Sequence, residues 1–392
     1  MKKRTLLTGL PFVAAAVGLF TACTQQPIQG PTLTASGLDP AAFDTVIDGK
    51  QVSLYTLTNE AGMEVCITNF GGRVVSIMVP TKDGQFIDAV IGYDNVAQYA
   101  DAVNSPSDYG ATIGRYANRI FHGKLPIGED TIQLPLNDNG HCLHGGPTGW
   151  QYRVYDAEQV DASTLKLTIV SPDGDNNFPG EVTAVATYTL TPDNTLDCTY
   201  EATTTKPTVI NMCNHSYFNL TGDPTQDGEQ QILYVNASAY TPADSSYMTT
   251  GEILSVEGTP MDFREPRVLA ETINDTVFDQ TRNATGYDHN WVLDTYADGQ
   301  GDESRVAASL YAPNTGILLE VFTNEPGIQV YTGNFQGTGI PGKHGQLYPK
   351  HVSVCLETQK YPDSPNKADW PSPLLLPGET YHSHVAYKFS VR

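Results

Sequence analysis

The feature of this sequence that most constrains its fold is a succession of short runs in which apolar and polar residues alternate. Clear examples are residues 182–190, 196–200 and 385–391. Alternation with a period of two places successive side chains on opposite faces of a β-strand. Turn sequences such as Asp193-Asn194 separate the runs. Many short strands with frequent turns predict an all-β protein, built as a large antiparallel sandwich or barrel.

Composition supports this architecture and excludes some classes of function. The 392 residues include 35 Gly and 26 Pro, and runs with helical periodicity are scarce. The only helices that we expect are short, such as one over residues 95–103. Strands and helices do not alternate along the chain, which argues against a dinucleotide-binding domain. The net charge of −22 disfavours nonspecific binding to nucleic acid or to an anionic lipid surface.

The first 22 residues are typical of a secretory signal peptide. A basic start, Lys2-Lys3-Arg4, precedes a largely apolar run that ends in small residues. This run is short for a membrane span and contains Pro11. Residues 19–23 resemble the cleavage site of bacterial lipoproteins, in which Cys23 becomes the lipidated first residue. We therefore expect an exported lipoprotein of a bacterial cell envelope; the alternative is a secreted protein with an incidental cysteine.

The part of the chain after the signal divides into a tether and one domain. Residues 23–40 are rich in Gln, Pro, Gly, Thr and Ser, which predicts a flexible tether. Residues 41–392 then form the mature domain, which is long enough for a large core. Besides Cys23 the chain has five cysteines, an odd number without a CxxC pair, which implies neither a zinc site nor a dense set of disulfides. The sequence is compatible with a monomer or a dimer.

A carboxylate at the end of a strand is the first candidate for chemistry. In residues 351–357 the apolar side chains share one face and predict contact with a core, while Glu357 ends the opposite face. A turn-rich run follows at residues 361–366. A single Glu on a strand is usually a solvated surface residue, so this stretch alone leaves both interpretations open.

Residues 211–220 form a second candidate region. They place amides, an imidazole and a phenol where a core strand would carry Val and Ile. His215, Tyr217 and Asn219 share one face by alternation. Such a polar face suits a ligand with many hydroxyl groups; the alternative is a satisfied polar cluster at a sheet edge.

Two shorter segments offer further donors. Residues 110–120 contain Asn118 beside Arg115 and Arg119, whose guanidinium groups are forked donors that stay charged. These groups suit vicinal hydroxyls or a carboxylate, and they are equally compatible with ordinary structural arginines. His144 precedes two glycines, which let the backbone approach a ligand closely.

Aromatic and polar side chains are adjacent in three more segments. Asp262 lies in a Met-Asp-Phe-Arg sequence, Asp288 lies near Trp291, and Gln329 shares a strand face with Tyr331. A flat ring can cover the C–H face of a sugar while planar polar groups pair with its hydroxyls. Together these segments predict a sugar site.

As a set, the polar segments resemble the aldose 1-epimerases, also called galactose mutarotases. The segments occur in the family's order and span nearly the whole mature chain. The resemblance is carried by GRYANRI (114–120), LHGG (143–146), NHSYFNL (214–220), MDFR (261–264), GYDHNW (286–291), GIQVYTGN (327–334) and CLETQKYPDSPN (355–366).

The resemblance implies the family's antiparallel β-sandwich and its reaction, which interconverts the α and β anomers of a free aldose of the glucose or galactose type. Ring opening needs a base for the C1 hydroxyl proton and an acid for the ring oxygen, but no cofactor. By resemblance Glu357 is the base and His215 the acid, in agreement with a carboxylate that is ionised at neutral pH and an imidazole that exchanges a proton there. The implied substrate contacts are Asn118, Arg119, His144, Asp262, Gln329 and Tyr217.

Two other functions are less compatible with the sequence. A non-catalytic sugar-binding lipoprotein would keep the pocket, but binding alone does not need both Glu357 and His215. A glycoside hydrolase needs two flanking carboxylates, for which Glu357 and Asp262 are candidates. The presence of His215 and the order of the motifs argue against a hydrolase. Asp288 and His289 match a family motif and are expected to be structural.

Overall fold

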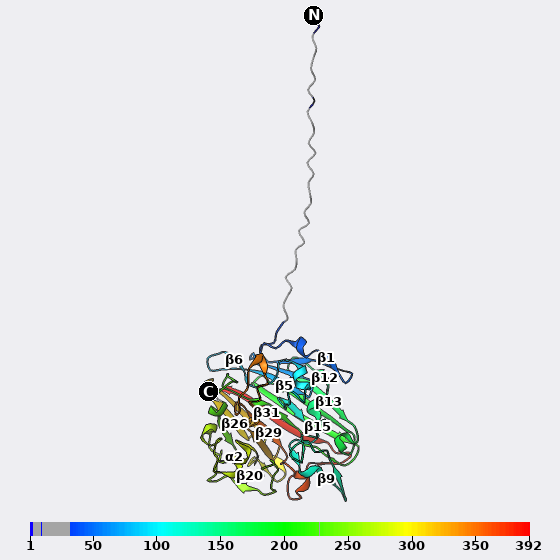
Figure 1. Cartoon of the computed structure of the whole chain (residues 1–392), viewed down its shortest axis with the longest axis vertical. Helices are drawn as coiled ribbons and strands as arrows, with labels where there is room; N and C mark the ends of the chain where they lie inside the picture. Colours follow the sequence, from blue (N-terminus) through cyan, green and yellow to red (C-terminus); the bar gives the residue numbers. More distant parts are fainter. Residues whose placement is uncertain (3–8, 10–31, 227) are drawn as a thin grey trace. The chain divides into compact units, whose positions relative to one another are not determined.

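The computed structural model describes residues 1–2, 9, 32–226 and 228–392 (Figure 1). Its largest sheet has nine strands in the order β12-β13-β14-β15-β31-β27-β26-β19-β22, and neighbouring strands are antiparallel. The strands are β12 (Asp156–Gln159), β13 (Thr164–Ser171), β14 (Val182–Leu190), β15 (Thr195–Thr204), β31 (Tyr381–Val391), β27 (Ile317–Thr323), β26 (Ala308–Ala312), β19 (Ile232–Val235) and β22 (Arg267–Val268).

A second sheet of six strands carries most of the residues of interest, in the antiparallel order β18-β29-β28-β23-β20-β21. Its strands are β18 (Tyr217–Phe218), β29 (Val354–Gln359), β28 (Gly327–Tyr331), β23 (Asp288–Val292), β20 (Ala239–Thr241) and β21 (Leu254–Ser255). A third sheet of four strands contains β3 (Leu54–Thr58), β4 (Glu64–Thr68), β5 (Arg73–Pro80) and β6 (Phe86–Asp88).

Short two-stranded pairs and helices complete the described part of the chain. The pairs are β1 (Thr45–Ile47) with β2 (Lys50–Val52), β9 (Lys124–Ile127) with β10 (Asp130–Gln133), β8 (Arg119–Ile120) with β11 (Cys142–Leu143), β7 (Ala111–Ile113) with β17 (Cys213–His215), β16 (Thr208–Val209) with β30 (Leu374–Leu375), and β24 (Tyr296–Ala297) with β25 (Gln300–Gly301). The α-helices are α1 (Val96–Ala100) and α2 (Asp279–Ala284). The 3-10 turns are η1 (Pro40–Phe43), η2 (Phe121–Gly123), η3 (Trp150–Tyr152), η4 (Asp175–Asn177), η5 (Gly228–Gln230), η6 (Leu269–Glu271), η7 (Lys343–Gly345) and η8 (Ser364–Asn366).

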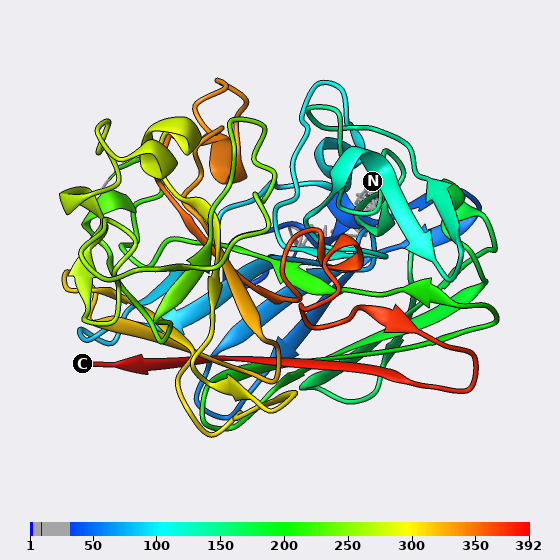
Figure 2. The same cartoon turned by 90° about the horizontal axis from the view of Figure 1, so that it is seen from below.

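The six-stranded sheet packs against the nine-stranded sheet. The ring of Phe218 in β18 lies 5.2 Å from that of Tyr387 and 6.4 Å from that of Phe389, both in β31. The Tyr387 hydroxyl also donates to the carbonyl of Leu356 at 3.0 Å. Strand β31 runs across almost the full width of the molecule (Figure 2). This packing confirms the predicted all-β antiparallel sandwich.

Strand β29 has the two faces that its alternation predicts. Val354 and Leu356 belong to the main hydrophobic core, while Cys355 lies in a separate cluster on the other side. Glu357 projects to the same side as Cys355. The strand begins at Val354, later than its sequence suggests, because His351 has a positive φ of 63°, which extended backbone does not allow.

The compact unit begins earlier in the sequence than predicted. Residues Leu33–Arg392 form one unit, so the predicted tether over residues 23–40 is wrong for its last part. Leu38 is buried in the core, the amide of Ala35 donates to Glu64, and Ser36 donates to Ser76. These contacts fix a segment whose composition alone is typical of a linker. The remaining tether residues, most of the predicted signal and Cys23 lie outside the described residues.

The described part of the chain contains no helix that is long and apolar enough to cross a membrane.

The five cysteines in the described part of the chain, Cys66, Cys142, Cys198, Cys213 and Cys355, are buried free thiols. The helix expected over residues 95–103 is present as α1, where Asn95 caps the amide of Gln98.

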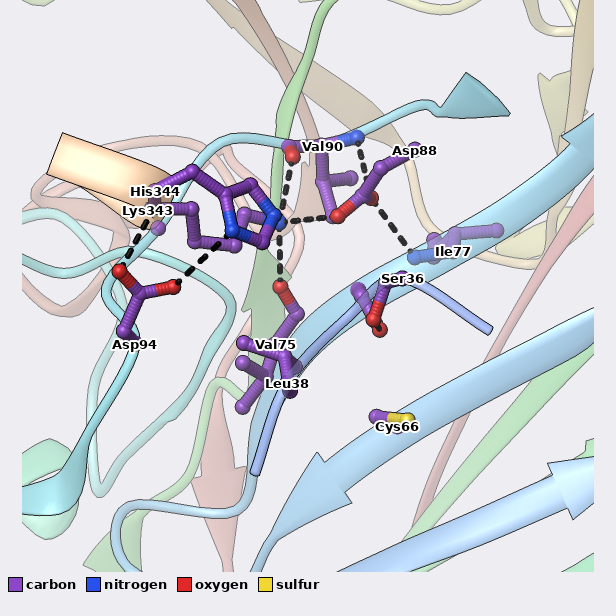
Figure 3. A network of polar contacts seen from close by, with 12 residues as sticks. Ser36, Leu38, Cys66, Val75, Ile77, Asp88, Val90, Asp94, Lys343 and His344 are labelled. Carbon is purple, nitrogen blue, oxygen red and sulfur yellow. Dashed lines mark hydrogen bonds and ion pairs between the residues drawn. The ribbon is translucent and has the colours of Figure 1, made fainter. Parts of the chain in front are cut away.

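A buried lysine ties the loop between β28 and β29 to the four-stranded sheet (Figure 3). The ammonium group of Lys343 pairs with Asp88 and donates to the carbonyls of Val75 and Val90, both at 2.8 Å. These three acceptors offset the cost of burying the charge. The amide of Lys343 donates to the hydroxyl of Tyr348, so the same anchor fixes an aromatic ring that lies near the site described next.

Candidate active site

The site is built around Glu357 in β29, the strand next to the β18 edge of the six-stranded sheet. The residue is buried, and its neighbours in β28 and β18 fix the position of β29 from both sides. One carboxylate oxygen, Oε1, lies 3.5 Å from Nε2 of His215. The other, Oε2, accepts a weak hydrogen bond from the thiol of Cys213, with 3.8 Å between sulfur and oxygen. The carboxylate is therefore buried in the protein and lies close to an imidazole.

His215 reaches the carboxylate because its segment breaks between two sheets. Residues 213–215 pair with β7 as β17, whereas Tyr217 pairs with Cys355 as part of β18. Asn214 makes the break by accepting a hydrogen bond from the amide of Ser216 at 3.0 Å. The rings of His215 and Tyr217 then stack, 5.0 Å apart at 18°. The predicted common face of these two residues is thus present although the strand is interrupted.

Asn219, the third member of that predicted face, has a structural role. Its amide donates to the carbonyl of Val352 at 2.6 Å, and its oxygen accepts from the amide of Thr221 at 2.9 Å. These bonds join the end of β18 to the segment that leads into β29. Asn219 therefore fixes the backbone around the site.

Gln329 and Asp288 extend the polar surface beside Glu357. Gln329 is the cross-strand partner of Glu357, and its amide donates to the carboxylate of Asp288 at 2.7 Å. Asp288 is buried, although its motif alone predicts a structural role. The signal that identifies it is the alternation of β23, which places Asp288 and Asn290 on one face, opposite Tyr331 and Gln329.

A third group comes from two loops that are bonded to each other. The amide of Asn118 donates to Nδ1 of His144 at 3.1 Å, and the amide of His144 donates to the carbonyl of Asn118 at 3.0 Å. Because Nδ1 accepts a hydrogen bond, the neutral ring carries its proton on Nε2. The His144 ring meets the His215 ring edge-on at 5.3 Å, so its donor belongs to the same pocket.

Arg119 is held beside this group by an acid and an aromatic ring. Its Nε donates to Asp138 at 2.9 Å, and its guanidinium lies 5.3 Å from the centre of the Tyr247 ring. The side chain of Asn118 accepts from the amide of Arg119 at 2.9 Å. The pair with Asp138 uses Nε, which leaves the terminal Nη groups of Arg119 to approach a ligand. Arg115, in contrast, is a structural arginine that donates to the Ser171, Pro172 and Pro179 region.

Asp262, which the resemblance predicts to contact the sugar, is bonded to a neighbouring arginine in the described structure. Its two carboxylate oxygens accept hydrogen bonds from Nε and Nη2 of Arg264 at 2.9 and 2.7 Å. Together they line a surface hollow with Gly258, Thr259, Glu265, Pro266 and Arg267. Asp262 and Asp288 both lie next to aromatic residues in the sequence, and the strand register places Asp288 beside Gln329.

Burial controls the proton affinities of the central pair. Burial raises the pKa of Glu357 well above its usual value, and the carboxylates of Asp288 and Asp108 raise it further. Burial lowers the pKa of His215, against which the charge of Asp108 acts. Burial thus disfavours the charged form of both groups, and because they lie so close together they titrate as a coupled pair.

The outer groups are held neutral in the same way. Burial lowers the pKa of His144 well below its usual value, with the charges of His215 and Arg119 acting in the same direction. Burial also lowers the pKa of His289 to about 3, and its Nδ1 accepts a hydrogen bond from the amide of Asp288. His289 is thus structural, as expected. His144 serves as a neutral hydrogen-bond donor.

Two groups of side chains have the spacing of metal ligands, but their protonation argues against that role. Asp108, His144 and His215 offer atoms within 4.8 Å of one another, as do His215, Cys355 and Glu357. The Nε2 of His144 carries a proton, and burial raises the pKa of Cys355 well above its usual value. A metal requires the unprotonated forms of both. The donor set suits hydrogen bonding to a polyhydroxy ligand better.

Fold and site together define the class of protein. It is an antiparallel β-sandwich in which aromatic rings, amides and a guanidinium surround an acid–base pair, which is an arrangement suited to a sugar. The profile of the aldose 1-epimerase family matches residues 53–388. The chain therefore belongs to the aldose 1-epimerase family and is an isomerase, and the reaction of this family interconverts the α and β anomers of an aldose.

Individual relatives support this assignment over most of the chain. Aldose 1-epimerase of Escherichia coli (strain K12) is 36% identical over 345 residues, which cover 87% of this chain and 96% of the relative. Galactose mutarotase of Mus musculus is 37% identical over 329 residues, which cover 84% and 92%. A solved aldose epimerase homologue from C. elegans has a TM-score of 0.79 at 26% identity, covering 87% of this chain and 99% of that one. Galactose 1-epimerase from Lactobacillus acidophilus has a TM-score of 0.75 at 29% identity, covering 88% and 97%.

Substitution of Asp288 and of Asp262 tests which of the two aspartates belongs to the active site. Asp288→Asn removes a buried charge that Gln329 bonds and should lower kcat/KM by about tenfold to a hundredfold, the range for a charged hydrogen bond. Asp262→Asn should change kcat/KM by less than about threefold because its partner is Arg264. Both are measured by polarimetry with freshly dissolved α-glucose. A larger loss of kcat/KM in Asp262→Asn than in Asp288→Asn would indicate that Asp262 contacts the substrate.

Proposed function

We propose that Glu357 and His215 exchange protons with a single bound aldohexose of the glucose or galactose type. The observation that carries this proposal is the 3.5 Å distance between Oε1 of Glu357 and Nε2 of His215. In a cyclic sugar the C1 hydroxyl oxygen and the ring oxygen are bonded to the same carbon. Two proton-exchanging groups at this spacing suit those two oxygens, one each.

The ring opens and recloses by one balanced proton transfer in each direction. Glu357 takes the proton of the C1 hydroxyl as the C1–O1 bond becomes a carbonyl. The C1–O5 bond breaks, and His215 gives its proton to O5, which keeps the bonding electron pair. Rotation about C1–C2 presents the other carbonyl face, and the same groups run in reverse. The cycle needs one exchangeable proton within the pair and no external proton donor, because each group ends the cycle in the protonation state in which it began it.

The surrounding side chains hold the sugar while its ring opens. His144 donates from Nε2 and Arg119 from its terminal Nη groups. Gln329 has a buried Oε1 that lacks a partner among the described residues and suits a hydroxyl proton. Asn118 positions both His144 and Arg119 through its backbone and side chain. Tyr217 supports the imidazole by stacking, and Asp288 orients Gln329. A free monosaccharide is the substrate, and the chemistry has no step that calls for a cofactor.

Removing either member of the pair should abolish most of the catalysis. Glu357→Gln and His215→Asn should each lower kcat by about 10²–10⁴-fold, the usual contribution of one positioned proton transfer. The measurement is the approach of optical rotation to equilibrium after α-glucose or α-galactose is dissolved. Circular dichroism and sugar binding serve as controls for an intact fold. Full activity in either variant would remove that residue from the reaction, and sugar binding without any acceleration by the wild type would indicate a binding protein.

We further propose that the protein is exported and anchored by a lipid on Cys23. The support is in the sequence: a basic start, an apolar run and a lipoprotein-like cleavage site at residues 19–23. The catalytic domain would then meet sugars in the bacterial cell envelope. The net charge of −22 makes adsorption of the domain to anionic lipid unfavourable, so attachment depends on the acyl chains.

Substitution of one sulfur tests the anchor. Cys23→Ser removes the atom that carries the lipid, so the protein should move from the membrane fraction to the soluble fraction. Fractionation of the cells that express it, followed by immunodetection, gives the result. Cys66→Ser is a matched control because Cys66 is buried in the described domain. Retention of the Cys23→Ser protein in the membrane fraction would contradict lipidation at this position.

A further inference from the structure

Asp108 is a carboxylate beside the catalytic pair that the reaction above does not use. It lies just before β7, the strand that pairs with β17 and therefore with His215. His215 is the register partner of Ala111, whose amide donates to the carbonyl of Asp108 at 3.0 Å. The amide of Gly110 donates to the carbonyl of His215, also at 3.0 Å. The backbone thus fixes Asp108 next to the imidazole.

The side chains of these two residues have complementary unpaired atoms. Within the described chain, Oδ1 of Asp108 and Nδ1 of His215 are both buried and lack a hydrogen-bond partner. Asp108, His215 and His144 each offer one side-chain atom within 4.8 Å of the others. Buried polar atoms are normally paired, so two unpaired atoms on neighbouring side chains require an explanation. A carboxylate oxygen accepts a hydrogen bond, and Nδ1 can donate one.

We propose that Asp108 is the positioning residue for His215: its carboxylate accepts the Nδ1–H of the imidazole, directly or through one water, and so keeps the exchangeable proton of His215 on Nε2. This inference rests on the proposed function. The Nε2 atom is the one that faces Glu357, and it is the one that exchanges a proton with the ring oxygen. Asp108 gains and loses no proton in the cycle.

The other groups around His215 do not supply this contact. Glu357 and Cys355 face it from β29, Tyr331 from β28, Tyr217 from β18 and His144 from the loop after β11, while the charge of Arg73 acts from β5. Glu357 is engaged at Nε2. Among these groups Asp108 is thus the carboxylate available to Nδ1. Its charge raises the pKa of both His215 and Glu357, so it favours the shared proton wherever that proton resides.

The test is Asp108→Asn, which removes the charge at nearly constant shape. Loss of a neighbouring negative charge lowers the pKa of an imidazolium, so the pair should lose its proton at lower pH. The basic limb of the kcat–pH profile should move about one pH unit to the acid side, and kcat at pH 8 should fall about tenfold. KM for glucose should change less than about twofold, because Asp108 does not hold the sugar.

Two further variants separate charge from loop structure. Asp108→Glu retains the carboxylate and should keep the basic limb near its wild-type position. Asp101→Asn perturbs the same loop, where Asp101 accepts from the amides of Val103 and Asn104, and should leave the limb unmoved. If Asp101→Asn shifts the profile as much as Asp108→Asn, or if Asp108→Glu fails to rescue it while folded, the proposal is wrong.

A titration that needs no turnover completes the experiment. Proton NMR of the His215 imidazole, assigned by its loss in His215→Asn, should titrate at lower pH in Asp108→Asn than in the wild type. An unchanged titration overturns the proposal, and so does a raised KM without a shift, which would place Asp108 on the sugar. Absence of any mutarotation by the wild type would instead refute the proposed function, and the NMR comparison would still decide the role of Asp108.

Discussion

The structure depends on one contact, in which a buried carboxylate and a buried imidazole are held 3.5 Å apart. Burial makes an ionised Glu357 and an ionised His215 both costly, and this is the condition in which two groups readily exchange one proton. On an exposed surface the same residues would titrate near their ordinary values and would be screened by water. The catalytic capacity of the site therefore comes from the environment that the fold imposes.

The fold provides this environment because the two faces of β29 have different roles: one packs in the main core and the other carries Glu357. Val354 and Leu356 fix β29 to the main core, so Glu357 projects from a rigid support. The break at Ser216 lets a single segment serve two sheets and brings His215 over the carboxylate. Rigid placement matters because proton transfer falls off steeply when the donor and acceptor are misplaced.

Much of this arrangement follows from local sequence patterns. Alternation predicted β14 and β15, and the turn between them occurs where Asn194 has a positive φ of 63°. The order of the polar motifs predicted the family, and Glu357 and His215 were found together. What alternation could not supply is the pairing of distant segments. Only the register of β23 against β28 reveals that Asp288, rather than Asp262, adjoins Gln329. Asp108 lies in a loop without any period, so nothing local distinguished it.

The central claim is that Glu357 and His215 act on the same sugar molecule. Its most direct test is a crystal structure of the Glu357→Gln variant with bound galactose. The account predicts the C1 hydroxyl oxygen within hydrogen-bonding distance of the residue 357 side chain, with the ring oxygen within the same reach of Nε2 of His215. A sugar whose C1 points away from these two side chains, or one seated in another part of the molecule, would contradict it.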